Sequence, residues 1–279
     1  MRCRFAFLLL GLALLTACAD RPLLIPPITG TVWQPTNNTI DPRGNWQHTG
    51  ATRLLVQWSA VDDIAFVSTD LMPAAPVLPA WQRIAAEPWA REVILGLAGR
   101  FDEKAARADM IGLAARSAAL ARLPTPLNVV GWYFPVEIDP TWTEATALGP
   151  LLSQLPRPLW ISVYDSANVG PDALVEGLVK WLPPDVGVFF QDGVGVHARE
   201  APVARQYADV MSAHLGKNRV RIIAEAFRPQ TGGGFRSATI TELGPQLASY
   251  AGYHIYLFDG PHYLTDTLVS QIVAGQKSR

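Results

Sequence analysis

Short runs of apolar, β-branched and aromatic residues alternate along the chain with longer segments of helical character. Most of these runs lack strict alternation of apolar and polar positions, as expected of strands that are covered on both faces. We predict eight strands, at residues 30–34, 53–58, 92–97, 128–134, 159–164, 186–191, 220–225 and 253–258. Helices are predicted at 79–90, 103–122, 143–155, 171–182, 200–216, 239–249 and 264–276, and none in the Gly-, Pro- and Asn-rich segment 35–52.

Repeated strand–helix units predict a parallel sheet, which either closes into a barrel or stays open and doubly wound. A dinucleotide-binding open sheet carries a glycine fingerprint after its first strand, but here the chain reads Gln34-Pro35-Thr36-Asn37-Asn38. Eight strands in a chain of this length fit a closed barrel, which typically takes about 250 residues. The sequence therefore predicts a single α/β domain, a (β/α)8 TIM barrel, over residues 30–279.

The first residues, MRCRFAFLLLGLALLTAC, have the form of an export signal, with a positive start and an apolar run. The run is shorter than the roughly 20 residues of a membrane-spanning helix. Leu15-Thr16-Ala17-Cys18 resembles the bacterial lipobox. We therefore expect a lipoprotein signal peptide at 1–17, a lipidated Cys18 and a proline-containing extended tether at 18–29. The alternative is an ordinary signal peptide with an incidental cysteine.

This interpretation predicts an exported protein that is lipid-anchored in the bacterial envelope. Ala19 after the anchor resembles lipoproteins of the outer membrane, so we expect the domain to face the periplasm. The only other cysteine, Cys3, lies in the signal peptide, which leaves no internal disulfide and no cysteine metal site. A net charge of −1 with both signs interspersed gives no footprint for nucleic acid. The five histidines have no tight metal spacing and no GxSxG motif is present, so we expect neither a metal nor a cofactor.

The active sites of such barrels form at the carboxyl ends of the strands. Polar residues gather at these ends: Gln34, Gln57, Arg100, Asp102, Tyr133, Glu137, Tyr164, Asp165, Gln191, Asp192, Glu225, Asp259 and His262. Three of the acids, Asp102, Asp165 and Asp259, need no explanation beyond a polar loop. His254, inside the last strand, is expected to be a core residue.

Two glutamates stand out from this set. Glu225 follows a continuous apolar run, where a carboxylate is costly unless it is hydrogen-bonded or functional, although Arg228 could be a structural partner. Glu137 follows the fourth strand and could instead cap a helix. Cleavage of a glycosidic bond needs two carboxyl groups, one protonated and one ionised. We expect Glu137 to be the general acid/base and Glu225 the nucleophile or base, with Asp192 as a third acid candidate.

Substrate contacts are expected from aromatic and polar side chains at the same strand ends. The flat faces of Trp and Tyr suit sugar rings, although barrel packing also uses aromatic residues. The glycines after Asp192 would let a ligand approach the backbone, and the glycine-rich loop from Arg228 to Arg236 could close over an anionic group. The predicted substrate-binding residues are Gln34, Trp58, Tyr133, Tyr164, Gln191, Asp192, Arg228, Trp33 and Trp132.

Five segments, GTVWQP, LLVQW, GWYFPVEID, FFQDGVG and AEAFRP, resemble those of a bacterial family of glycosidase-like barrel lipoproteins, domain of unknown function 4434, in order and spacing. The placement of the two glutamates is also similar to that in the large retaining clan of barrel glycoside hydrolases, but the clan's acid/base follows an asparagine, and here Val136 precedes Glu137. The resemblance implies a polysaccharide or oligosaccharide ligand, with other envelope polysaccharide proteins as partners.

The function expected from the sequence is a lipid-anchored glycoside hydrolase or hydrolase-like protein acting on an exported or cell-envelope polysaccharide. The principal alternative is a non-catalytic polysaccharide-binding lipoprotein. A third is an envelope scaffold that holds a protein partner.

Overall fold

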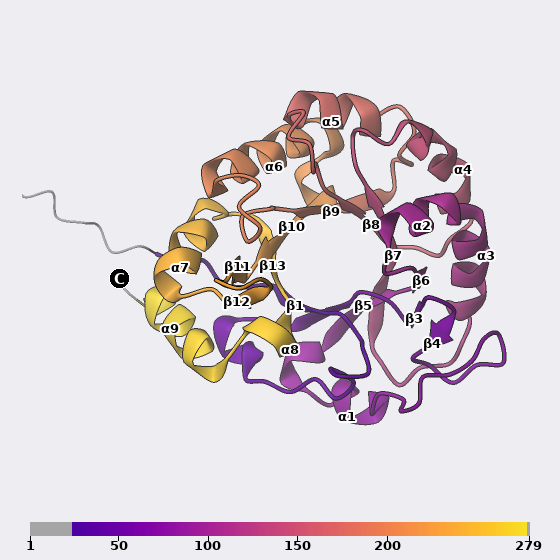
Figure 1. Ribbon diagram of the computed structural model, residues 1–279, viewed down its shortest axis with the longest axis horizontal. Helices are drawn as coiled ribbons and strands as arrows, with labels where there is room; N and C mark the ends of the chain where they lie inside the picture. The colour runs from indigo at the N-terminus through magenta and orange to yellow at the C-terminus, as the bar shows by residue number, and fades with distance from the viewer. Residues whose placement is uncertain (1–23, 278–279) are drawn as a thin grey trace, which may run out of the picture.

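The computed structural model describes residues 24–277 and contains a closed barrel of eight parallel strands surrounded by helices (Figure 1). Around the barrel the order is β1-β13-β10-β9-β8-β7-β5-β2. The strands are β1 (Gly30–Trp33), β2 (Arg53–Val56), β5 (Glu92–Gly96), β7 (Val129–Ile138), β8 (Leu159–Val163), β9 (Val186–Gln191), β10 (Val220–Glu225) and β13 (His254–Phe258). The predicted (β/α)8 barrel is confirmed, and each predicted strand corresponds to one strand of the barrel.

One strand differs from the prediction in a way that matters for the site. Strand β7 continues to Ile138, with a register irregularity between Phe134 and Glu137 where it pairs with β8. Glu137 was expected in the loop after the strand, but it lies within the strand, opposite Ser162. The irregularity turns the end of the strand, as β-bulges beside functional sites often do.

The outer layer is helical, and several predicted helices are interrupted. Segment 79–90 forms a short helix and a 3₁₀ turn because Pro88 cannot continue a helix. Segment 103–122 divides at Asp109, and 35–52 contains only a 3₁₀ turn, as predicted. The helices are α1 (Trp81–Ala85), α2 (Glu103–Ala108), α3 (Met110–Leu120), α4 (Leu148–Leu152), α5 (Pro171–Leu178), α6 (Ala201–Leu215), α7 (Ile240–Ser249), α8 (Gly260–Tyr263) and α9 (Asp266–Lys277), with 3₁₀ turns η1 (Trp46–Thr49), η2 (Pro88–Ala90), η3 (Thr143–Ala147) and η4 (Lys217–Arg219).

Successive side chains on each strand point alternately into the barrel and out toward the helices. Inward-facing side chains fill the interior, so the barrel is a packed core and not a channel. This interior cluster consists of Val32, Leu55, Ile94, Tyr133, Trp160, Phe189, Ile223 and Tyr256. A second, larger apolar layer lies between the strands and the helices. The same alternation between inward and outward side chains determines which polar residues at the strand ends face the barrel mouth.

The folded part begins before the predicted boundary at Gly30. Ile25 and Ile28 are buried, and the Ile25 N–H donates to the Gly275 carbonyl at 3.3 Å. The segment 24–29 therefore packs on the barrel through its apolar side chains and is not a free tether. Cys18 and the predicted signal peptide lie outside the described residues. Within residues 24–277, no helix is long and apolar enough to span a membrane.

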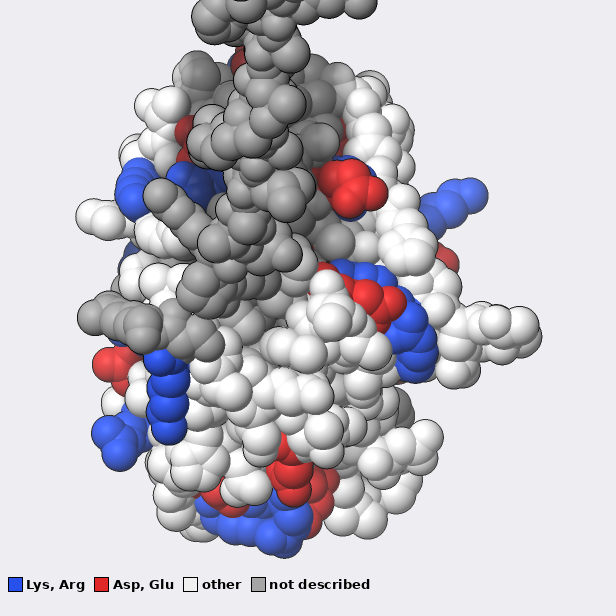
Figure 2. All heavy atoms as spheres, turned by 90° about the vertical axis from the view of Figure 1, so that its left-hand side faces the viewer, with Lys and Arg blue, Asp and Glu red and all other residues white. Residues whose placement is uncertain are grey.

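Two small sheets extend the loops at the carboxyl ends of the strands. Strands β3 (Ala60–Val61), β4 (Ile64–Ala65) and β6 (Ala98–Gly99) form one of them. Strands β11 (Phe227–Pro229) and β12 (Phe235–Ser237) form a hairpin beyond β10. The segment expected as an irregular lid, 228–236, is therefore largely this hairpin, with glycines at positive φ at its tip. On the one side of the molecule that Figure 2 shows, charges of both signs are scattered over the described surface.

Candidate active site

Polar side chains form the last inward-facing layer at the carboxyl end of the barrel. Gln57, Ser162, Gln191 and Glu225 each come two residues after a member of the interior cluster, so they share its inward orientation. Beside Gln57 and Gln191 is a small hollow of about 10 Å³, lined by Val32, Leu55, Gln57, Tyr133, Gln191, Ile223 and Phe258. Ser162 was not predicted as a site residue, because a single serine inside an apolar strand does not indicate a function.

Glu137 reaches this layer from β7 and is partly buried. The Gln191 side-chain amide donates to its Oε2 atom, and the same nitrogen lies 2.7 Å from Ser162 Oγ. Burial, and after it the negative charge of Glu103, raises the pKa of Glu137 to about 8. A carboxyl group with this pKa is protonated at neutral pH and can donate a proton in a reaction.

Glu103, in the first turn of α2, contacts the backbone of Glu137. Its Oε2 atom accepts the Glu137 N–H at 3.1 Å, and burial raises the pKa of its own carboxyl. From the same helix, Arg107 donates to the Glu137 carbonyl at 3.2 Å and lies over the Trp142 ring at 5.5 Å from its centroid. Acids are common in the first turn of a helix because they interact favourably with the helix dipole, so the sequence did not mark Glu103 as a site residue.

Glu225 ends β10 and is only 6% exposed. The Val196 N–H donates to its Oε2 atom at 3.1 Å, and Gly195 lies so close that an added Cβ would be 2.5 Å from the Glu225 Cβ. Burial, and then the charge of Asp192, raises the pKa of Glu225 to about 8. The loop after β9 therefore covers this carboxyl group.

Gln191 and Tyr164 connect the surroundings of the two glutamates. Gln191, the partner of Glu137, pairs in register with Ile223 on the strand that ends in Glu225. Tyr164 is half-buried beside them, and after burial the charges of Glu225 and Glu137 contribute to raising its pKa. Four of the predicted site residues, Glu137, Tyr164, Gln191 and Glu225, are thus brought together. Two carboxyl groups with raised pKa values at one mouth can supply one proton donor and, after one ionisation, one base or nucleophile.

Asp192 does not face this mouth. Its parity is opposite to that of Gln191, and its side chain has no exposed surface. Its oxygens accept hydrogen bonds from Tyr250 OH at 2.8 Å, Gln246 Nε2 at 2.6 Å and the backbone N–H groups of Val194 and Glu225 at 3.2 Å. The prediction that it contacts substrate is wrong in this structure, because the carboxylate is already satisfied by four donors that hold the loop and α7 in place.

Arg228 is also a structural residue. It is 5% exposed, and its guanidinium donates to the carbonyls of Glu225, Phe227 and Glu242 and to Gln246 Oε1. Neither a lid contact nor the Glu225 ion pair considered above is formed. Arg228 instead joins the β10–β11 turn to α7, through the same Gln246 that binds Asp192.

The three predicted tryptophan platforms are packed away from the mouth. Trp33 is fully buried and donates to the Thr39 carbonyl at 2.9 Å; Trp58 is 2% exposed and donates to the Pro35 carbonyl at 2.9 Å. Trp132 lies in the layer between strands and helices, next to the inward-facing Tyr133 in the sequence. Trp33 and Trp132 point outward from their strands, and Trp58 is buried under loops, so none of the three is placed to contact substrate. Trp142 also packs against the apolar layer between the strands and the helices.

Two further predicted contacts lie at the mouth only in part. Tyr133 is 2% exposed and lines the hollow from within the barrel. Gln34 is partly exposed, and its backbone N–H donates to Asp259 at 3.4 Å.

Three acids at the strand ends have structural roles in loops. Asp259 caps α8, Asp102 caps α2, and Asp165 accepts hydrogen bonds from the Val169 and Gly170 N–H groups. These three acids have the loop roles that the simplest interpretation gave them.

His254 was expected in the core, but it is exposed at the start of β13 and lies 3.3 Å from Thr29 Oγ1. Because it begins the strand, its side chain lies outside the packed layers. Among residues 24–277, no group of three His, Cys, Asp or Glu side chains could hold a metal ion.

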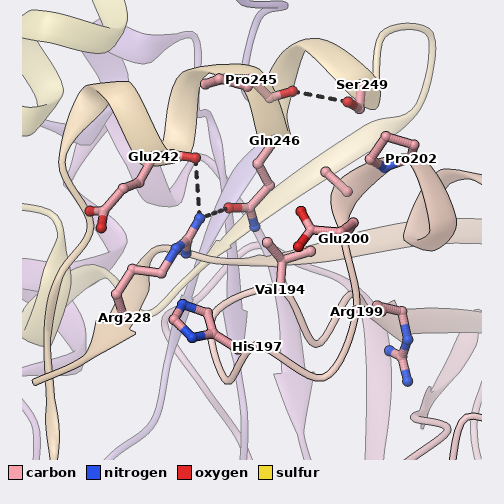
Figure 3. A pocket seen from close by; sticks show the side chains of 11 residues that line it. Val194, His197, Arg199, Glu200, Pro202, Arg228, Glu242, Pro245, Gln246 and Ser249 are labelled. Carbon is pink, nitrogen blue, oxygen red and sulfur yellow. Dashed lines mark hydrogen bonds between the residues drawn. The ribbon is translucent and has the colours of Figure 1, made fainter.

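A larger pocket, of about 360 Å³, lies beside the barrel mouth between the start of α6 and α7 (Figure 3). Gln246 and Arg228 form one wall, and Figure 3 shows them hydrogen-bonded to each other, with His197 and Glu200 on the facing loop. His197 and Glu200 are exposed. The hydrogen bonds of Gln246 to Asp192 and to the Glu225 carbonyl link this wall to the back of the site.

Neither a protein-family model nor a curated protein sequence matches this chain. A solved structure from Bacteroides thetaiotaomicron, described as a "putative alpha-L-fucosidase", is similar over 100% of both chains, with a TM-score of 0.66 and 15% sequence identity. At that identity the likeness shows a shared barrel fold.

Proposed function

We propose that the protein is a glycoside hydrolase, lipid-anchored in the bacterial envelope through Cys18, that acts on an exported or cell-envelope polysaccharide. The observation that carries the proposal is the pair of glutamates at the carboxyl end of one barrel, the partly buried Glu137 held by Gln191 and the buried Glu225 held by the Val196 N–H. Burial raises the pKa of each carboxyl group to about 8. The description of the similar barrel from Bacteroides supports a glycoside as substrate. Membership of domain of unknown function 4434 is part of the same proposal.

In this mechanism the protonated Glu137 donates to the leaving glycosidic oxygen, and the ionised Glu225 attacks the anomeric carbon or activates a water. Gln191 fixes the orientation of Glu137. In the absence of sugar the Val196 N–H donates to Glu225, which favours its ionised form. A sugar that reaches Glu225 has to displace part of the loop 193–197, because this loop covers the carboxyl group.

The low exposure of Glu225 specifically favours a second candidate, a polysaccharide-binding lipoprotein without turnover. In this alternative the covered glutamate is a structural acid, and the pocket beside the mouth receives the glycan. Both candidates place a polysaccharide or oligosaccharide at the same end of the barrel.

A glycan array combined with an assay for reducing-end release distinguishes the two. The mature protein is applied to exported and envelope polysaccharides, and each glycan that binds is tested for new reducing ends. We expect both binding and release. Binding without release on any bound glycan supports the binding lipoprotein, and the absence of binding contradicts both candidates.

A further inference from the structure

The two ends of the barrel carry opposite charge. We define the amino-end face as the segments that lead from each helix or turn into the next strand, together with the last residue of α9; they are residues 50–53, 86–92, 121–129, 153–159, 179–186, 216–221, 250–254 and 277. It contains nine cations, Arg53, Arg91, Arg122, Arg157, Lys180, Lys217, Arg219, Arg221 and Lys277, and three acids, Glu87, Glu92 and Asp185. The segments that leave the strands contain ten acids and five arginines. Six of these acids and three of these arginines are not buried; the buried ones are Asp139, Asp165, Asp192, Asp259, Arg199 and Arg228.

The acids of the amino-end face are already neutralised locally, in the pairs Glu87–Arg83, Glu92–Arg53 and Asp185–Arg157. Five exposed residues of this face, Arg91, Arg122, Lys180, Lys217 and Lys277, form no salt bridge with any carboxylate of residues 24–277. We use the term free cations for the four that lie between a helix or turn and the next strand, Arg91, Arg122, Lys180 and Lys217. The excess positive charge of the face is therefore available to an external anion.

The described chain also starts at this face. Leu24 is 48% exposed, and Ile25 packs on Gly275 near the end of α9. Cys18 precedes Leu24 by six residues, which span at most about 20 Å when fully extended. A lipid on Cys18 would hold the amino-end face, and not the acidic mouth, close to the bilayer.

We infer that the amino-end face is a docking surface for an anionic phospholipid bilayer and that the mouth with Glu137 and Glu225 opens away from the membrane. Each Lys or Arg close to an anionic bilayer strengthens binding roughly fivefold, within a screening length of about 10 Å at moderate salt. The acidic loops at the other end are repelled by the same surface. The inference goes beyond the proposed activity and shares with it only the anchor at Cys18.

Cations near the carboxyl ends of helices also offset the helix dipole, which gives an alternative role for Arg122, Lys180 and Lys217. Arg91 follows a 3₁₀ turn and not an α-helix, so this role does not explain its position. The two roles have different consequences. A dipole role predicts that charge reversal lowers stability and leaves lipid binding unchanged, whereas docking predicts a response that depends on the lipid.

The test uses the full-length chain, purified with its anchor and placed in vesicles of phosphatidylethanolamine, with or without phosphatidylglycerol. No cysteine follows Cys18, so a single fluorophore can be attached at Asn218→Cys on the amino-end face or at Gln230→Cys at the opposite end. Energy transfer to an acceptor-labelled lipid is then measured. We expect phosphatidylglycerol to increase transfer from position 218 and not from 230, and added salt to remove the increase.

Replacing all four free cations by glutamate should abolish this increase, while the control Lys104→Glu, an exposed lysine on α2, should retain it. Equal transfer in both kinds of vesicle, or an unchanged response in the four-residue variant, would overturn the inference. The inference would also be overturned if the amino-end face bound a soluble acidic polysaccharide more tightly than the vesicles.

Mass spectrometry of the amino-terminal peptide reports separately whether Cys18 is acylated. If it is not, binding of the added chain to phosphatidylglycerol vesicles should still fall at least tenfold in the four-residue variant. Failure of the proposed anchor can therefore be distinguished from failure of the docking surface, and neither result depends on glycan turnover.

Discussion

Replacing Glu225 by glutamine should flatten the dependence of stability on pH. The folded protein raises the pKa of Glu225 from 4.5 to about 8, chiefly by burial. Between these values the folded state binds more protons than the unfolded state, so the stabilising contribution is complete below pH 4.5 and is lost as the pH rises toward 8. A difference of about 3.5 between the folded and unfolded pKa corresponds to a change of at most about 5 kcal/mol in the free energy of unfolding.

The assay is urea unfolding of the wild type and of Glu225→Gln at intervals between pH 5 and 8. The amide cannot ionise, so the variant should gain stability relative to the wild type as pH rises, by a few kcal/mol in total. The amide oxygen of the variant can still accept from the Val196 N–H, and the amide itself adds no dependence on pH. Glu176→Gln, at an exposed position on α5, is the matched control and should show no trend. If the difference between Glu225→Gln and wild type stays constant from pH 5 to 8, the carboxyl group is not held in its protonated form and the reasoning fails.

Two other substitutions test the packing behind the site. Tyr250→Phe removes a donor from the buried Asp192 and should lower the free energy of unfolding by about 1–3 kcal/mol in chemical denaturation; an unchanged value would show that the network is not needed. Gly195→Ala would bring a Cβ to 2.5 Å from Glu225, so we expect a lower melting temperature and a displaced loop, whereas Gly177→Ala on α5 meets no atom within 4 Å and should stabilise by about 0.5–1 kcal/mol. Equal effects of the two alanines would contradict the close contact.

The barrel could be predicted because the strands are continuous apolar runs separated by turn residues. The same continuity explains the errors at the site. When both faces of a strand are apolar, the sequence does not indicate which parity faces the barrel interior. Trp33 and Trp132 were assigned to the mouth although they point outward, and Asp192 was grouped with its neighbour Gln191, which has the opposite orientation.

Other features depend on contacts between distant segments. Glu103 is 34 residues before Glu137, and only the fold brings its carboxylate to the Glu137 N–H. Arg228 was expected in a mobile lid because three glycines follow it, but its four hydrogen bonds are to backbone and side-chain oxygens of β10, β11 and α7. The two glutamates were identifiable because a carboxylate at the end of an apolar strand requires a specific reason.

The most direct test of the paired carboxyl groups is kcat on a glycan that the wild-type protein cleaves, compared with Glu137→Gln and Glu225→Gln, together with the affinity of each protein for the same glycan. The account predicts that either substitution lowers kcat at least a hundredfold while the glycan still binds, since each removes one of the two groups that act on the bond. Turnover that persists in either variant would contradict the assignment of that glutamate, and turnover that persists in both would place the chemistry elsewhere in the protein.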